Sequence, residues 1–246
     1  MAKDDNSIMR KMVDNMAQQS AAVLSKKPEV DNFKRIVPSL VEKGIDNINL
    51  SMFNEETRLG LLNALGEEYH RKGVLDQAIK AFILAGNRSS LTEIGRDYEK
   101  VALFSNAIDA FRLADNRAEL QRLGDKCLAE GRLADAIKAF RLLGDNEKLV
   151  KVGDYCLQKN KWDFAIEVFS AIKNKAKLVE VGEKCLADNG IAYAFKAFAL
   201  AEDKDKLNLL GDTCLRQNML RMAIDSYEKA NNTMMLEFIK ENVPGA

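Results

Sequence analysis

The sequence lacks several features that assign proteins to common functional classes. Basic residues (Lys and Arg, 37) equal acidic residues (Asp and Glu, 37), so the formal net charge is zero, whereas a nucleic-acid-binding protein usually has a basic surplus to meet phosphate. The only histidine is His70, so a metal site built on two histidines is excluded. Phosphate-binding, dinucleotide-binding and nucleophile-elbow glycine motifs are also missing. We therefore expect no catalytic residues, no metal, no cofactor and no nucleic acid.

Long apolar runs and proline are equally scarce. No stretch of about 18 apolar residues occurs, so no membrane span is expected. The first residues, Met-Ala-Lys-Asp-Asp-Asn, have neither the basic start nor the apolar run of a secretory signal. Four cysteines in a chain without such a signal favour a reducing compartment, so a cytoplasmic location is expected. Three prolines, together with abundant Ala, Leu, Lys and Glu, favour helix.

What the sequence does contain is an internal repeat of 29 residues. Leucine stands four residues before each repeat glycine, alanine twelve residues after it, and an aromatic residue sixteen residues after it. The glycines are Gly66, Gly95, Gly124, Gly153, Gly182 and Gly211. The aromatic residues are Phe82, Phe111, Phe140, Phe169, Phe198 and Tyr227. A fixed period of this length indicates a solenoid of stacked structural units.

The spacing within each repeat predicts two helices. The leucine and glycine columns form one apolar stripe, helix A, and residues such as Leu133, Ala136, Ile137 and Phe140 form a second stripe, helix B. Between them lie Gly73, Ala102, Gly131, Asn160, Asn189 and Asn218, of which all but alanine tolerate a left-handed conformation. After helix B come Asn87, Asn116, Asp145, Asn174, Asp203 and Asn232. Each is expected to cap the next helix A, with about 1 kcal/mol of stabilisation.

Glycine in a helix is unfavourable, so its recurrence requires a packing reason. We predict that the small residues of the two helices, such as Gly124 and Ala136, let paired backbones approach closely. Larger side chains at these positions should overpack the hairpin.

The first hairpin resembles the tetratricopeptide repeat. The resemblance is carried by Leu62-x2-Leu65-Gly66-x2-Tyr69 followed by Ala78-x3-Phe82, and as a recurring set it covers residues 59 to about 240. It implies an all-α fold, a right-handed α-solenoid of about six antiparallel helical hairpins. Two departures are the period of 29 rather than about 34 residues and the missing proline after the second helix. The shortened helix B is similar to the hairpins of vesicle-coat and ciliary-transport solenoids.

Three segments are predicted: N-terminal helices in 1–58, six hairpins in 59–232, and a C-terminal capping helix and tail in 233–246. An apolar stripe predicts a first helix that continues to about Lys26, and a second stripe predicts a helix that stops near Gly44. The first stripe consists of Ile8, Met9, Met12, Val13, Met16 and Ala17. Residues 1–58 either cap the solenoid or dock a partner or a second copy through the Met-rich helix.

The predicted function is a non-enzymatic scaffold or adaptor that binds a partner protein or peptide. The resemblance implies that helix A lines a concave surface and that the residue after each glycine faces it. The candidate partner-binding residues are Asn63, Glu67, Gln121, Asp125, Leu128, Asp154, Leu157, Glu183, Leu186, Asn208, Asp212 and Leu215. Either the acids and leucines hold a basic or basic/apolar peptide, or the acids pair with neighbouring Lys or Arg while the leucines pack between helices. The alternative function is a structural subunit of a coat, tether or secretion complex that docks through its flanks or N-terminal helix.

The four cysteines and Trp162 are interpreted as core residues. Cys127, Cys156, Cys185 and Cys214 share one repeat column. Neighbouring helices lie about 8–10 Å apart, whereas a disulfide needs Cα atoms within about 7 Å. Four thiolates strung along a solenoid also do not enclose one zinc ion.

Overall fold

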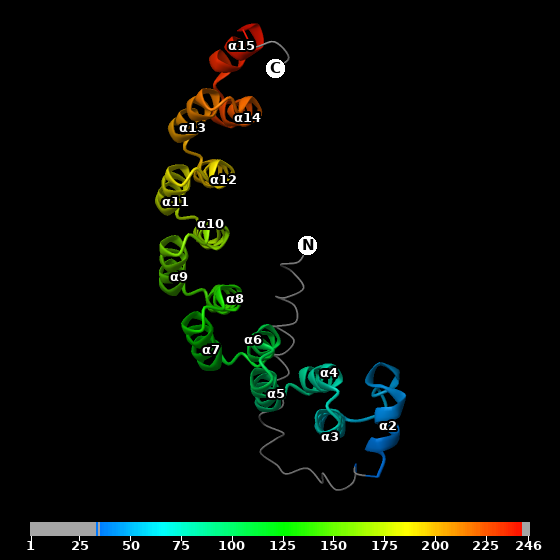
Figure 1. The fold of residues 1–246 in the computed structure, drawn as a ribbon. Coiled ribbons are helices and arrows are strands. Elements are labelled where there is room, and N and C mark those ends of the chain that lie inside the picture. The colour runs from blue at the N-terminus through cyan, green and yellow to red at the C-terminus, as the bar shows by residue number, and fades with distance from the viewer. Residues whose placement is uncertain (1–32, 34, 243–246) are drawn as a thin grey trace. The chain divides into compact units, whose positions relative to one another are not determined.

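The described residues form helices joined by short turns (Figure 1). The computed structural model describes residue 33 and residues 35–242, and within them it contains fourteen α-helices and no β-strand. The predicted all-α fold is therefore confirmed for this part of the chain. Contacts divide the chain after Ala129 into two units, which are described separately.

Unit 1 is built from consecutive helices that pack on their neighbours in sequence. Its elements are α2 (Val37–Lys43), the 3-10 helix η2 (Ile45–Asn47), α3 (Glu55–Arg71), α4 (Leu75–Ala85), α5 (Arg88–Lys100), α6 (Phe104–Leu113) and α7 (Arg117–Ala129). Two antiparallel hairpins, α3–α4 and α5–α6, have the most extensive contacts. The second helix of each hairpin also contacts the helix that follows, α5 or α7.

Unit 2 repeats the same arrangement. Its elements are α8 (Leu133–Leu143), α9 (Asn146–Gln158), α10 (Trp162–Ala171), α11 (Lys175–Ala187), α12 (Ile191–Ala201), α13 (Lys204–Arg216), α14 (Leu220–Ala230) and α15 (Thr233–Asn242). The hairpins are α9–α10, α11–α12 and α13–α14; α8 packs on α9, and α15 packs on α14. By repeat register the odd-numbered helices from α3 onward are helices A, and the even-numbered helices from α4 onward are helices B.

Turn and cap residues occupy the predicted positions. All six residues between helix A and helix B have positive φ, including Ala102 at 58°. The side chain of every predicted cap accepts a hydrogen bond from the backbone N–H three residues on, at distances from 2.9 Å at Asp145 to 3.2 Å at Asn116. These bonds satisfy backbone donors that a helix start leaves unpaired. The predicted turns and helix caps of the repeat are thus confirmed.

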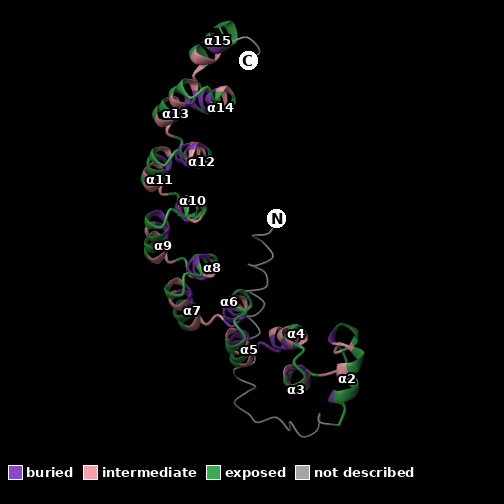
Figure 2. Ribbon diagram, in the orientation of Figure 1, coloured by how far each residue is buried: buried purple, intermediate pink, exposed green. Residues whose placement is uncertain are grey.

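The repeat glycines make room for aromatic rings. A Cβ atom added at Gly66, Gly95 or Gly153 would lie 2.5 Å from the ring of the aromatic residue sixteen positions later. Each of those rings is fully buried, and the column alanines, such as Ala78 and Ala107, are fully buried as well. Close packing of the hairpin is as predicted, but the space beside glycine is filled by the helix B ring and not only by backbone. Figure 2 shows that buried residues lie on the faces where paired helices meet.

The N-terminal part of unit 1 contacts the first hairpin. Helix α2 ends at Lys43, just before Gly44, as the sequence predicts, and Gly44 has φ of 82°. Val37 and Ile45 are buried, and the Tyr69 hydroxyl on α3 donates a 3.2 Å hydrogen bond to the Val41 carbonyl. The predicted helix over residues 8–26 lies outside the described residues.

The cysteine column belongs to the core. All four cysteines are reduced and fully buried. Burial raises the pKa of Cys156 to about 11 and that of Cys185 to about 12, because the thiolate loses its hydration. These thiols are consequently poor nucleophiles at neutral pH. Trp162, at the start of α10, is half-buried, so it is less enclosed than the core position that the sequence predicts.

Candidate protein-binding surface

The predicted acidic column lies on the helices A, and ion pairs occupy much of it. The Asp154 carboxylate on α9 forms an ion pair with the Lys177 ammonium of α11, with 2.8 Å between oxygen and nitrogen. The Glu183 carboxylate on α11 forms the same kind of pair with Lys206 of α13, at 2.5 Å. Each pair joins the residue after one repeat glycine to the residue five before the next. In unit 1 the same two positions hold Arg96 and Glu119 with the signs exchanged, 2.7 Å apart. The alternative in which the acids pair with neighbouring cations therefore describes these positions.

The other column members have different surroundings. Asp212 accepts a 2.6 Å hydrogen bond from the buried Tyr227 hydroxyl. Burial, followed by the nearby Asp212 carboxylate, raises the pKa of Tyr227, because the phenolate would lose hydration beside a negative charge. Glu67 is exposed on α3, and Asp125 is half-exposed on α7. The column is thus not a uniform row of available carboxylates.

Two of the candidate binding residues, Asn63 and Asn208, form hydrogen bonds to the next repeat. The Asn63 side-chain oxygen accepts a 2.7 Å hydrogen bond from the Asn87 amide, and Asn208 accepts one of 2.8 Å from Asn232. Asn87 and Asn232 are the caps of the following helices A. Asn63 and Asn208 therefore orient those caps, while Gln121 is exposed on α7.

The candidate leucines differ in accessibility. Leu157 is only 3 % exposed, so it packs in the interior of unit 2. Leu128, Leu186 and Leu215 are half-buried. Leu186 and Leu215 retain surface that a partner can reach.

A charged network that the sequence interpretation missed spans α5 and α7. Glu99 is paired with Arg122 and, at 2.9 Å, with Lys126. Arg122 also reaches Glu119 at 2.6 Å, and Glu119 pairs with Arg96. Hydrogen bonds from Arg122, with a further contribution from Lys126, outweigh desolvation and lower the pKa of Glu99 to about 2. A search for opposite charges 23 and 27 residues apart would have found this network.

The remaining polar clusters are structural in form. His70 on α3 lies 2.6 Å from Asp97 of α5, with both side chains partly covered. Among the described residues no group of three or more His, Cys, Asp or Glu side chains is placed to hold a metal ion. No helix in the described part of the chain is both long and apolar enough to cross a membrane.

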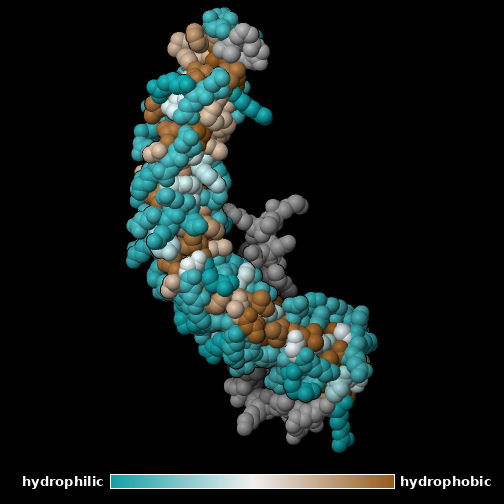
Figure 3. All heavy atoms as spheres, viewed as in Figure 1, coloured by the Kyte–Doolittle hydropathy of each residue, from teal (hydrophilic) through white to brown (hydrophobic). Residues whose placement is uncertain are grey.

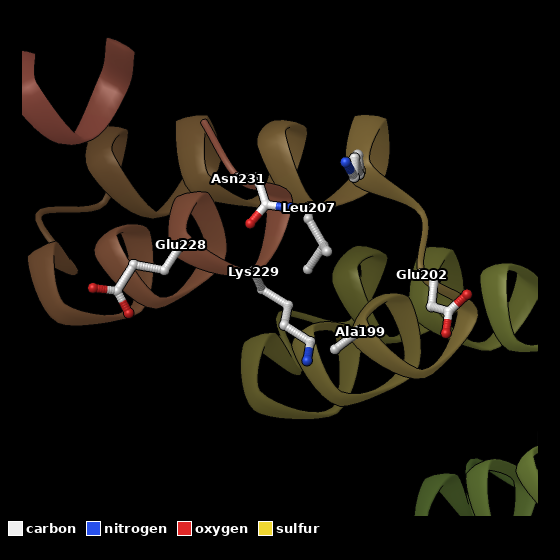
Figure 4. A pocket seen from close by; sticks show the side chains of 7 residues that line it. Ala199, Glu202, Leu207, Glu228, Lys229 and Asn231 are labelled. Carbon is white, nitrogen blue, oxygen red and sulfur yellow. The ribbon is translucent and has the colours of Figure 1, made fainter. Parts of the chain in front are cut away.

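Shallow pockets lie between neighbouring hairpins of unit 2. One, of about 590 Å³, is lined by Ala199, Glu202, Lys204, Leu207, Glu228, Lys229 and Asn231. Figure 4 shows Glu202 and Glu228 at opposite ends of this pocket, with Leu207 and Lys229 between them. A second, of about 320 Å³, includes Trp162 and Lys184. Carboxylate and ammonium groups are mixed along the first pocket, so it has no single charge with which to select a small ligand.

Large apolar side chains are exposed in both units. In unit 1 they include Val74, Val101 and Leu103 at the turns between helix A and helix B. In unit 2, Leu209 of α13 and Met234 and Phe238 of α15 are 45 %, 73 % and 53 % exposed. Figure 3 shows hydrophobic atoms over α4 to α6 and again near α13 to α15. Clustered exposed apolar side chains mark interaction surfaces more often than isolated ones do.

Comparisons with known proteins do not place the chain in a family. No family model and no curated protein matches it.

Proposed function

We propose that this protein is a non-enzymatic protein–protein interaction scaffold, built as a right-handed solenoid similar to tetratricopeptide-repeat proteins. The architecture is supported by the 29-residue repeat, by the hairpins within each unit and by the aromatic ring packed on the repeat glycines Gly66, Gly95, Gly153, Gly182 and Gly211. Repeat arrays of this kind provide an extended surface whose exposed positions can change while the buried positions stay fixed. The buried, unreactive cysteines are compatible with the expected reducing, cytoplasmic compartment.

The observation that carries the proposal is the exposed apolar surface of unit 2. Leu209, Met234 and Phe238 remain accessible although the core of the unit is complete without them. Exposing such side chains to water is unfavourable by about 25 cal/mol per Å², so a partner that covers them gains binding energy. Flexible methionine suits a surface that adapts to its partner.

This surface favours apolar docking over a basic peptide held by the acidic column, which is compatible with the alternative role of a subunit in a larger assembly. Asp154 and Glu183 are already neutralised by lysines of the adjoining repeat. A basic peptide in the predicted groove would have to displace those lysines, and exchanging one exposed ion pair for another gains little free energy. Apolar contacts have no such competitor within the described residues.

Binding measurements on surface variants test the proposal. The full chain is used as bait in extract of its source cell, the captured protein is identified and purified, and its affinity is measured. We expect Met234→Asp/Phe238→Asp to weaken that affinity at least about tenfold, and Asp154→Lys/Glu183→Lys to change it less. The opposite ranking would support the acidic column as the binding site and contradict apolar docking.

Val101→Asp is the matched control because Val101 is 63 % exposed but lies in unit 1. Helical circular dichroism shows whether each variant is folded. Capture of no protein in stoichiometric amount would overturn the scaffold function itself.

A further inference from the structure

Two exposed positions of the helices A, two residues before the glycine and four residues after it, change from charged to apolar toward the end of unit 2. In unit 1, Arg122, two residues before its glycine, pairs with Glu99, four residues after the preceding glycine. In unit 2 the equivalent pairs of positions hold Leu186 with Leu209, and Leu215 with Phe238. Their side chains are half-buried or exposed. The same register that supports an ion pair in unit 1 therefore supports an apolar strip here.

Met234 extends this strip along α15. Residues four apart share a helix face, so Met234 and Phe238 lie on one side of α15, and Ile239, which is 1 % exposed, faces the interior. We call the surface made by Leu186, Leu209, Leu215, Met234 and Phe238 the apolar strip. Two of these residues, Leu186 and Leu215, were already candidate binding residues.

Acidic residues border the apolar strip. The helical period places Asp205 and Asp212 beside Leu209, and Glu237 and Glu241 beside Met234 and Phe238. Two cations lie on the same face of α13: Arg216 at its end, and Lys206, which pairs with Glu183 of α11, so that the carboxylates remain in excess. The strip is therefore suited to an apolar helix face with basic flanks.

The segment of residues 7–27 has that chemistry. Its apolar stripe includes Met9, Met12, Val13 and Met16 at helical spacing. The segment also contains Arg10, Lys11, Lys26 and Lys27, against the single acid Asp14. Charge and apolar pattern are thus complementary to the apolar strip.

We propose that residues 7–27 of one copy dock on the apolar strip of a second copy. The donor surface and the acceptor surface are different, so the contact is heterologous and links copies head to tail. The inference deepens the proposed scaffold function, because it identifies one partner of the exposed surface as the protein itself. Electrostatic complementarity makes the association sensitive to salt.

Sedimentation of the full chain over a concentration series of about 1 to 200 µM tests this association. We expect the average mass of the wild type to rise reversibly with concentration and to fall when salt is added. Phe238→Asp removes the acceptor, and Met12→Asp removes the donor. Each is expected to weaken self-association at least about tenfold. Met234→Asp provides a second acceptor variant at a still more exposed position.

Mixing the two single variants is the decisive step. Phe238→Asp keeps an intact donor and Met12→Asp keeps an intact acceptor, so the mixture is expected to form a 1:1 dimer although neither variant associates alone. The control Val101→Asp should associate like the wild type. A monomeric wild type, a mixture that stays monomeric, or association that survives Met12→Asp would each overturn the proposal. Capture of a heterologous partner by the same variants would leave the scaffold function standing, so the two failures are distinguishable.

Discussion

Gly95→Ala is expected to destabilise unit 1, although the same change stabilises an ordinary helix. Alanine is favoured over glycine in a helix interior by about 1 kcal/mol. At Gly95, however, the new Cβ would lie 2.5, 2.6 and 3.0 Å from Cε1, Cδ1 and Cζ of Phe111. Carbon atoms in favourable contact are about 3.5–4.0 Å apart, and the Phe111 ring is fully buried and enclosed. Overpacking of this kind is unfavourable by about 1–3 kcal/mol, so after the gain from helix propensity we expect a net loss of up to about 2 kcal/mol.

Removing the ring should reverse the sign of the effect. Phe111→Ala alone is expected to destabilise by about 3–5 kcal/mol through the cavity it leaves. In that background the clash is gone, so adding Gly95→Ala should stabilise the protein by about 1 kcal/mol. Urea unfolding followed by helical circular dichroism, on the four members of the double-mutant cycle, measures the coupling. A higher urea midpoint for Gly95→Ala in the wild-type background, or an equal effect in both backgrounds, would refute the ring-over-glycine explanation.

Three further substitutions test other parts of the repeat. The pKa of Glu99, lowered to about 2 by Arg122 and Lys126, means that its carboxylate stabilises the fold above pH about 4.5 and loses this effect as pH falls toward 2. Because Arg122 is half-exposed, Glu99→Gln should reduce stability at pH 7 by about 1 kcal/mol, and urea titrations should show the difference vanishing only below pH about 2. Ala102→Gly should increase the free energy of unfolding by up to about 1 kcal/mol, because Ala102 has φ of 58°. The urea midpoint should therefore rise, and a lower midpoint would contradict this explanation. Asn174→Ala should lose about 1 kcal/mol with its cap bond, which hydrogen exchange at the start of α11 would detect as faster exchange.

The local features predictable from the sequence are those that depend on one residue type at one position. Asn and Asp before each helix A predict a cap because their side chains reach the backbone N–H three residues on, and each such bond is present. The left-handed turns after helix B were not predicted. At Lys173 and Glu202 φ is positive, although neither residue type favours that conformation. The geometry of the hairpin junction imposes the left-handed conformation at these positions, so the residue types there do not predict it.

The candidate surface was less predictable because it depends on which repeats are neighbours. The sequence suggests that Asn63 is an accessible polar residue, but its side-chain oxygen is hydrogen-bonded to the Asn87 amide of the next repeat. Likewise, the sequence suggests that Glu183 offers a charge for binding a partner, whereas in the structure that charge is paired with Lys206. The lengths of the helices and the angle between them decide these pairings, and a single repeat taken alone does not specify them.

The exposed positions of the helices A therefore contain information that the buried columns do not. Glycine, alanine and the aromatic residue recur at each repeat because a change at any one of them alters the same packed hairpin. Two residues before the glycine there is no such constraint, and the side chain there changes from Arg122 to Leu209 and Phe238. Ion pairs at this position join adjacent repeats, whereas an exposed leucine or phenylalanine adds nothing to that junction that the buried columns do not already provide. Its energetic advantage has to come from contact with another molecule, so substitutions of the exposed apolar side chains of unit 2 are expected to affect binding more than substitutions of its acidic column.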